Sequence, residues 1–160
     1  MLIRVFLIFL CFVLYGCSWN TRFAISNLTD ADIEISIASR MYTHVNTGEV
    51  ICPLINGSRL EVSDDYLWYF NSGDWLVLPK GRQTVDELAC SIKFSIKTGE
   101  SVVIANVATY TGLVGRGDVI DVAQVEIRRQ GKLVIYKGVE LLNKFQKIDD
   151  LLYVMRVTGV

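Results

Sequence analysis

The sequence predicts a mainly β protein, an antiparallel β-sandwich of about seven or eight strands with one short helix near the C-terminus. Three observations lead to this fold class. Apolar residues occupy every second position in several short runs, the pattern of strands that are buried on one face. Clusters of Asn, Asp, Gly, Ser and Thr separate these runs, as turns do. Apolar residues make up 51% of the chain, which excludes a disordered tail.

Besides an aromatic hairpin, five strands are expected before residue 110, each from its own apolar run. The run at 102–108 is almost wholly apolar, as in a strand that is buried on both faces. Residues 84–87 have the spacing of a helix capping box, but strand continuation through Val85 fits the pattern equally well. The five expected strands are Phe23–Ser26, 33–37, 60–62, 92–96 and 102–108.

The C-terminal part is expected to hold a hairpin, a helix and a last strand. Val125 and Ile127 lead into a turn near Gly131, and 133–136 returns as the second strand of the hairpin. After residue 138 the apolar period changes from two to that of a helix, which predicts a helix over 141–148 and a strand from about residue 151. The helical spacing rests on Leu141, Leu142, Phe145 and Ile148, with Glu140 early and Lys144 and Lys147 late, as the helix dipole prefers.

An aromatic segment at 66–70 is the densest feature of the chain after its N-terminus. With a turn at 71–74 and a return over 75–78, it is expected to form a hairpin. Both faces of this hairpin would be apolar, so one packs on the core and the other is covered by the C-terminal helix or by a partner protein, carbohydrate or lipid. The candidate binding surface consists of Tyr66, Trp68, Tyr69, Phe70 and Trp75.

The N-terminus has the form of an export signal. Arg4 supplies a positive charge, Val5–Tyr15 is a short apolar run, and small Gly16 precedes Cys17. The segment Leu14-Tyr15-Gly16-Cys17 resembles the lipobox of bacterial envelope lipoproteins, although Tyr15 is bulkier than the usual occupant. The resemblance implies cleavage of residues 1–16 and lipid on Cys17. It further implies a single lipid-anchored domain of 160 − 16 = 144 residues, at the outer membrane and facing the periplasm.

The alternative is an ordinary secretory signal that is cut after Ser18, since Gly16 and Ser18 are both small. In that case Asn27 and Asn56, which each begin an Asn-x-Ser/Thr triplet, would mark a secreted eukaryotic glycoprotein domain. The shape of the signal favours the lipoprotein.

Two cysteines remain for the folded domain once Cys11 is removed and Cys17 is assigned to the anchor. In an oxidising compartment Cys52 and Cys90 are most simply a disulfide. A redox pair or a metal site is the weaker interpretation, because the chain has no Cys-x-x-Cys motif and His44 is its one histidine.

A second, looser resemblance covers about a third of the chain. Leu78-Pro79-Lys80-Gly81, a strand at 94–97, the turn Thr98-Gly99-Glu100 and the apolar run that follows are similar to small β-sandwich lipoproteins of the envelope. This resemblance implies the fold class and carries no catalytic residue.

Charge and side-chain chemistry narrow the function. Without Arg4 the mature chain has 15 basic and 17 acidic residues, so its net charge of 15 − 17 = −2 does not fit a nucleic-acid binder. The neighbours of His44 form no catalytic triad pattern, so we expect no enzyme activity, no cofactor and no metal. The expected function is a non-catalytic, membrane-anchored lipoprotein that docks an envelope protein partner through the aromatic hairpin or a strand edge. The alternative is a module that binds a small glycan or lipid.

Overall fold

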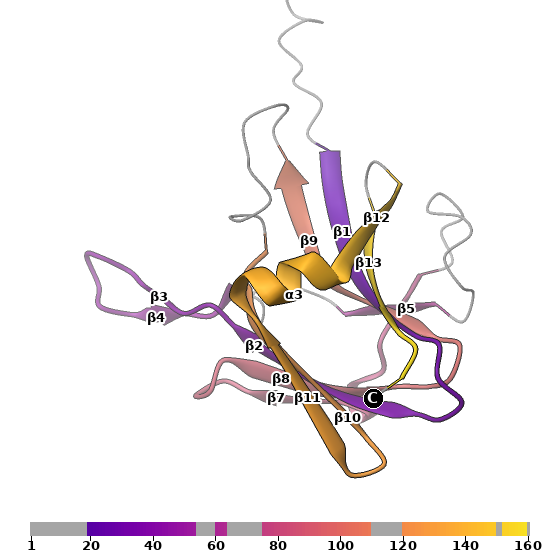
Figure 1. Cartoon of the computed structure of the whole chain (residues 1–160). Coiled ribbons are helices and arrows are strands. Elements are labelled where there is room, and N and C mark those ends of the chain that lie inside the picture. Colours follow the sequence, from indigo (N-terminus) through magenta and orange to yellow (C-terminus); the bar gives the residue numbers. More distant parts are fainter. Residues whose placement is uncertain (1–18, 54–59, 64–74, 110–119, 150–151, 160) are drawn as a thin grey trace, which may run out of the picture.

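Two β-sheets pack against each other around one apolar core, and a two-stranded hairpin projects from them (Figure 1). This computed structural model describes residues 19–53, 60–63, 75–109, 120–149 and 152–159. The fold is mainly β and forms a sandwich with a helix near the C-terminus, as the sequence predicted. Thirteen strands are present in the described residues, and eight of these are five residues or longer.

The first sheet, sheet A, has six strands and contains both ends of the described chain. The strands that come first and last in the chain, Trp19–Asn27 and Leu152–Val157, pair in parallel, with Phe23 opposite Tyr153. The other pairs of described strands are antiparallel. The strand order of sheet A is β12 (Phe145–Asp149), β13 (Leu152–Val157), β1 (Trp19–Asn27), β9 (Ser101–Thr109), β5 (Glu61–Ser63) and β6 (Leu76–Val77).

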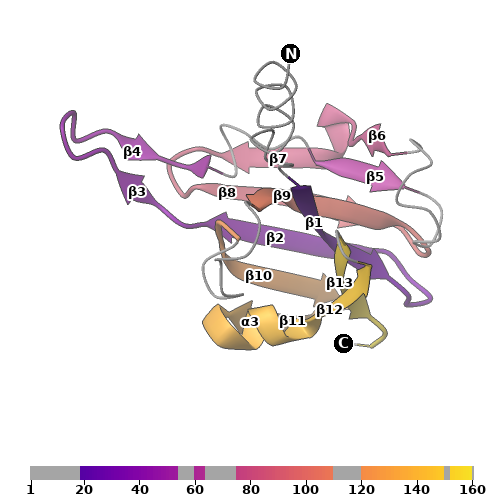
Figure 2. The ribbon, with the colours of Figure 1, turned by 90° about the horizontal axis from the view of Figure 1, so that it is seen from above.

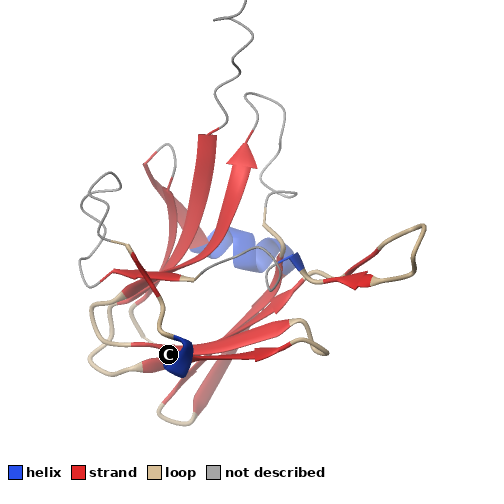
Figure 3. Cartoon of the chain, turned by 180° about the vertical axis from the view of Figure 1, so that it is seen from behind, coloured by secondary structure: helices blue, strands red, loops and turns tan. Residues whose placement is uncertain are grey.

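The second sheet, sheet B, has five strands and lies below sheet A in Figure 1 and on the same side in the reverse view of Figure 3. In β2 and β8 buried residues alternate with accessible ones, which confirms the predicted period of two. The strand order of sheet B is β11 (Lys132–Lys137), β10 (Val122–Arg129), β2 (Ile33–Ser39), β8 (Ser91–Ile96) and β7 (Gln83–Asp86).

The core lies between the two sheets and consists mainly of β-branched and aromatic side chains. Sheet A contributes Phe23, Ile25, Val102, Ile104, Met155 and Val157, while sheet B contributes Ile33, Ile35, Ile37, Ile92, Phe94, Ile96, Val125 and Ile127. A smaller cluster on the opposite face of sheet A contains Ala24, Val103, Leu152 and Val154. Strand β9 therefore has buried apolar residues on both faces, as predicted from its sequence.

The predicted hairpin near Gly131 is confirmed. Strands β10 and β11 are joined by Gln130 and Gly131, and both residues have positive φ, at 47° and 80°. Positive φ at both central positions is the requirement of a type I′ turn, whose twist matches that of the flanking strands. For residues 84–87 the sequence allowed either the start of a helix or a continued strand. The structure has the strand: β7 continues through Asp86, and a turn follows it.

The C-terminal helix is shorter than predicted. Helix α3 spans Gly138–Lys144, so it begins before the predicted range of 141–148, and residues 145–148, expected to be helical, lie in strand β12 instead. The reason is tertiary: β12 pairs with β13, and the ring of Phe145 packs edge-on against Phe23 with centroids 5.5 Å apart. Helix α3 joins the edge strands β11 and β12 of the two sheets and buries Leu141 (Figure 2).

Candidate functional site

The two-stranded hairpin is the most exposed part of the described structure. Strands β3 (Tyr42–Thr43) and β4 (Val50–Ile51) and the turn between them form an arm, defined here as residues 41–51, that extends away from both sheets in Figures 1 and 2. Every residue from 41 to 50 is exposed. Four of them are large apolar residues, with exposed fractions of 55% for Met41, 46% for Tyr42, 97% for Val45 and 55% for Val50.

The base of the arm is fixed to the body by several contacts. The Tyr42 hydroxyl donates a hydrogen bond to Asp121 Oδ1 at 3.0 Å, and the Arg40 amide donates to the Asp121 carbonyl at 2.7 Å. Directly after β4, Cys52 forms a disulfide with Cys90, with 5.6 Å between their Cα atoms. The predicted disulfide therefore joins the arm to the turn that precedes β8. These contacts hold the base of the arm from both sides.

A second candidate site is a hollow of about 400 Å³ on the outer face of sheet B, opposite the core. Register places its side chains in two rows that run across the strands. The first row contains Glu126, Ser36, Lys93 and Thr84, each opposite the next on the neighbouring strand.

The second row of the hollow contains Leu133, Arg128, Glu34 and Ser95, again in strand order. Glu34, Lys93 and Arg128 are exposed. Among the described residues, none of these three takes part in an ion pair within 4.0 Å. The Glu126 carboxylate accepts a hydrogen bond from the side-chain amide of Gln124 at 2.6 Å. Apart from Arg82, the hollow thus presents two carboxylates and two cations, with Leu133, 46% exposed, at its border.

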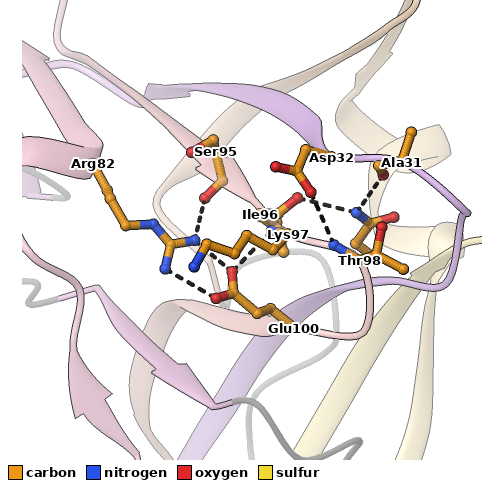
Figure 4. A network of polar contacts seen from close by, with 9 residues as sticks. Ala31, Asp32, Arg82, Ser95, Ile96, Lys97, Thr98 and Glu100 are labelled. Carbon is orange, nitrogen blue, oxygen red and sulfur yellow. Dashed lines mark hydrogen bonds and ion pairs between the residues drawn. The ribbon is translucent and has the colours of Figure 1, made fainter.

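Arg82 lines one end of the hollow and is held there by a buried carboxylate (Figure 4). It ends the 3-10 turn η1 (Lys80–Arg82), and its guanidinium donates to Glu100 Oε1 at 3.0 Å, pairs with Glu100 Oε2, and donates to the Ser95 carbonyl at 2.9 Å. The Lys97 amide also donates to Glu100, at 2.8 Å. The bidentate pair fixes the orientation of Arg82.

The pKa of Glu100 reflects this setting. Burial of the carboxyl, the largest influence, raises its pKa, since the charged form loses hydration. Hydrogen bonds from Arg82 and from the Lys97 amide, together with the attraction of both cations, outweigh burial and hold the pKa below its ordinary value. Glu100 is therefore ionised at neutral pH, and Arg82 is committed to it.

Most of the predicted aromatic surface lies outside the described residues. This applies to Tyr66, Trp68, Tyr69 and Phe70, and also to the anchor residue Cys17. Trp75 is described: it is partly buried and packs on the small apolar cluster on the outer face of sheet A. The structure does not bring Trp75 together with the arm or with the hollow.

Asn27, which begins one of the two glycosylation triplets, has an exposed fraction of 0%. Its Nδ2 donates to the carbonyls of Ala31 at 2.9 Å and Ile96 at 3.0 Å. A glycan would replace one of the two hydrogens on this nitrogen, break at least one of these bonds and have to fit into the interior, so the folded domain does not accommodate one at Asn27. The second triplet, at Asn56, is outside the described residues.

His44 lies in the exposed turn of the arm, where its main chain pairs with Glu49 and Gly48. In the part of the chain that the structure describes, no three His, Cys, Asp or Glu residues gather as metal ligands. Over the same ranges, no helix combines the length and hydropathy that a bilayer span requires.

Sequence reasoning missed both the arm and the hollow. The arm has no alternating run, and its one local signal is Gly48, whose φ of 70° suits a turn. The polar residues of the hollow were expected on strands, yet their grouping depends on the order of the strands.

The fold and these two sites define a β-sandwich domain with a projecting arm and a charged hollow on one sheet. Comparison with protein-family models, curated proteins and solved structures gives no significant match.

Proposed function

We propose that this chain is a non-catalytic envelope lipoprotein, held in the membrane by lipid on Cys17, that docks a protein partner through the arm. The observation that carries the proposal is the arm itself. A two-stranded ribbon that exposes Met41, Tyr42, Val45 and Val50 adds no buried core to the monomer. Apolar and aromatic side chains of this kind form the centres of protein interfaces.

The main chain of the arm supports the same function. Among described strands, β3 and β4 pair only with each other, so each has an outer edge to which an extended segment of a partner can add. An isolated two-stranded hairpin is marginally stable in water. Here the disulfide at Cys52 and the bond from Tyr42 to Asp121 hold the base, which reduces the ordering cost of binding. The partner expected is a protein with an apolar groove beside a free strand edge.

Site-specific photo-crosslinking in native envelopes tests the docking surface. A photoreactive amino acid replaces Val45 in the arm or, as the matched control, Val139 on α3, a valine that is 73% exposed. We expect one discrete adduct from position 45 and none from position 139, and we expect Met41→Ser to weaken that adduct. Equal adducts from both positions, or none from position 45, would contradict docking through the arm.

The anchor is tested separately. Cys17→Ala is expected to abolish acyl labelling and to release the protein from membranes, because a single cysteine carries the lipid. Unchanged partitioning of the variant into membranes would refute the anchor and leave the result for the arm standing.

A further inference from the structure

We propose that the hollow on sheet B binds a small zwitterionic ligand, one that carries an ammonium and a carboxylate, such as a short peptide with free termini. The site is separate from the arm and does not depend on it. Its lining consists of two rows of side chains, whose order across the sheet follows from the strand register.

The balance of charge selects the class of ligand. With Arg82 committed to Glu100, the hollow retains two cations, Lys93 and Arg128, and two carboxylates, Glu34 and Glu126. A purely anionic ligand would meet both carboxylates, and a purely cationic one would meet both bases. A zwitterion places each of its charges against the opposite sign, which also reduces the cost of removing water from both partners.

The positions of these charges suit a compact ligand. Arg128 stands directly opposite Glu34 on the neighbouring strand, and directly opposite residues of an antiparallel pair are about 5 Å apart. Lys93 stands opposite Ser36, one strand further along the sheet. The ligand carboxylate therefore faces Arg128 and its ammonium faces Glu34, while the Ser36 hydroxyl, two residues from Glu34 on β2, can donate or accept a further hydrogen bond.

Size and border specify the rest of the ligand. A volume of about 400 Å³ is within the range of small-molecule pockets. The border on β11 is apolar: Leu133 is 46% exposed and stands opposite Arg128. A ligand with an apolar side chain next to its charged termini would cover Leu133. At the other end, Arg82 is kept in place by Glu100 and closes the hollow without competing for the ligand (Figure 4).

The test is a titration of the isotopically labelled, full-length protein with the dipeptide glycyl-leucine, followed by amide NMR shifts. We expect saturable shifts of the amide signals of β2, β8 and β10, with a dissociation constant on the order of a millimolar. N-acetyl-glycyl-leucine lacks the ammonium and glycyl-leucinamide lacks the carboxylate. Each is expected to bind at least about ten-fold more weakly, the equivalent of one lost charged contact.

Variants locate the site. Glu34→Gln and Arg128→Gln are each expected to weaken binding about five-fold or more, whereas Glu140→Gln, on the exposed surface of α3, leaves it unchanged. Glu34 and Arg128 are both exposed, so their variants are expected to fold, and unchanged NMR shifts of distant amides verify this. No saturable shifts at about 10 mM peptide, or equal affinity for blocked and free peptides, would overturn the proposal.

Discussion

Replacing Asn27 by alanine is expected to remove a large share of the stability of the domain. Asn27 is fully buried at the end of β1. Its Nδ2 donates to the carbonyls of Ala31 and Ile96, and its Oδ1 accepts from the amide of Thr29 at 3.0 Å and from the Thr29 hydroxyl at 2.7 Å. Three of these bonds hold the turn after β1 together, and the bond to the Ile96 carbonyl joins that turn to the end of β8, 69 residues away.

The magnitude follows from the bonds. At about 1 kcal/mol for each hydrogen bond, the loss is at most about 4 kcal/mol. The Thr29 hydroxyl has a single hydrogen, and without Asn27 it can donate this hydrogen to the Ala31 carbonyl at 2.7 Å instead, so about 3 kcal/mol is expected for Asn27→Ala. For a domain of this size, that loss lowers the melting temperature by about 10 °C.

Equilibrium urea unfolding, followed by circular dichroism, measures the effect. Asn143→Ala on the exposed face of α3 is the matched control and is expected to change stability by less than about 0.5 kcal/mol. Asn27→Asp keeps the acceptor but turns the donor into an oxygen that faces two carbonyls, so it is expected to cost at least as much as alanine. A loss below about 1 kcal/mol for Asn27→Ala, or wild-type stability for Asn27→Asp, would refute this account.

Three further predictions follow from other parts of the fold. Because the folded-state pKa of Glu100 is lowered, its stabilisation is complete above the ordinary value of 4.5 and is lost as the pH falls through the lowered pKa; Glu100→Gln should remove this component from unfolding curves measured against pH. Gly131→Ala should cost about 1 kcal/mol in thermal unfolding because φ is 80° there, whereas Gly81→Ala, with no positive φ and open space around it, should be nearly neutral. Replacing both Cys52 and Cys90 by serine opens a loop with a sequence separation of 38 and should lower the free energy of unfolding by about 4 kcal/mol. The reduced wild type should match this variant in urea unfolding, and a difference between them would argue against the disulfide as the cause.

Much of sheet B could be predicted because its strands are buried on one face. In β2 and β8 isoleucine alternates with Glu34, Ser36 and Lys93, and the alternation alone assigns each side chain to the core or to the outer face. The end of the helix was harder to predict, because the apolar residues keep helical spacing beyond Lys144, through a segment that forms strand β12. Phe145 is in a strand because its contact with Phe23, 122 residues earlier (145 − 23), outweighs the local pattern.

The candidate sites were less accessible to sequence reasoning, for a different reason. A hollow on a sheet depends on which strands are neighbours, and β2 lies between β8 and β10, both more than 50 residues further along the chain. Nothing in the local sequence specifies that order. The pair of Arg82 and Glu100 is 18 residues apart and likewise forms only once η1 and β9 are in place.

The position of β1 limits where a partner of the arm can be. Strand β1 begins at Trp19, two residues after Cys17 (19 − 17), and two extended residues span at most about 7 Å. Under the proposed anchor, the start of β1 is therefore expected to lie close to the lipid headgroups. The arm leaves the body sideways relative to β1 in both Figure 1 and Figure 2. With β1 upright on the membrane, we expect the arm to extend along the membrane, and the partner that we propose for it to lie at the same membrane surface.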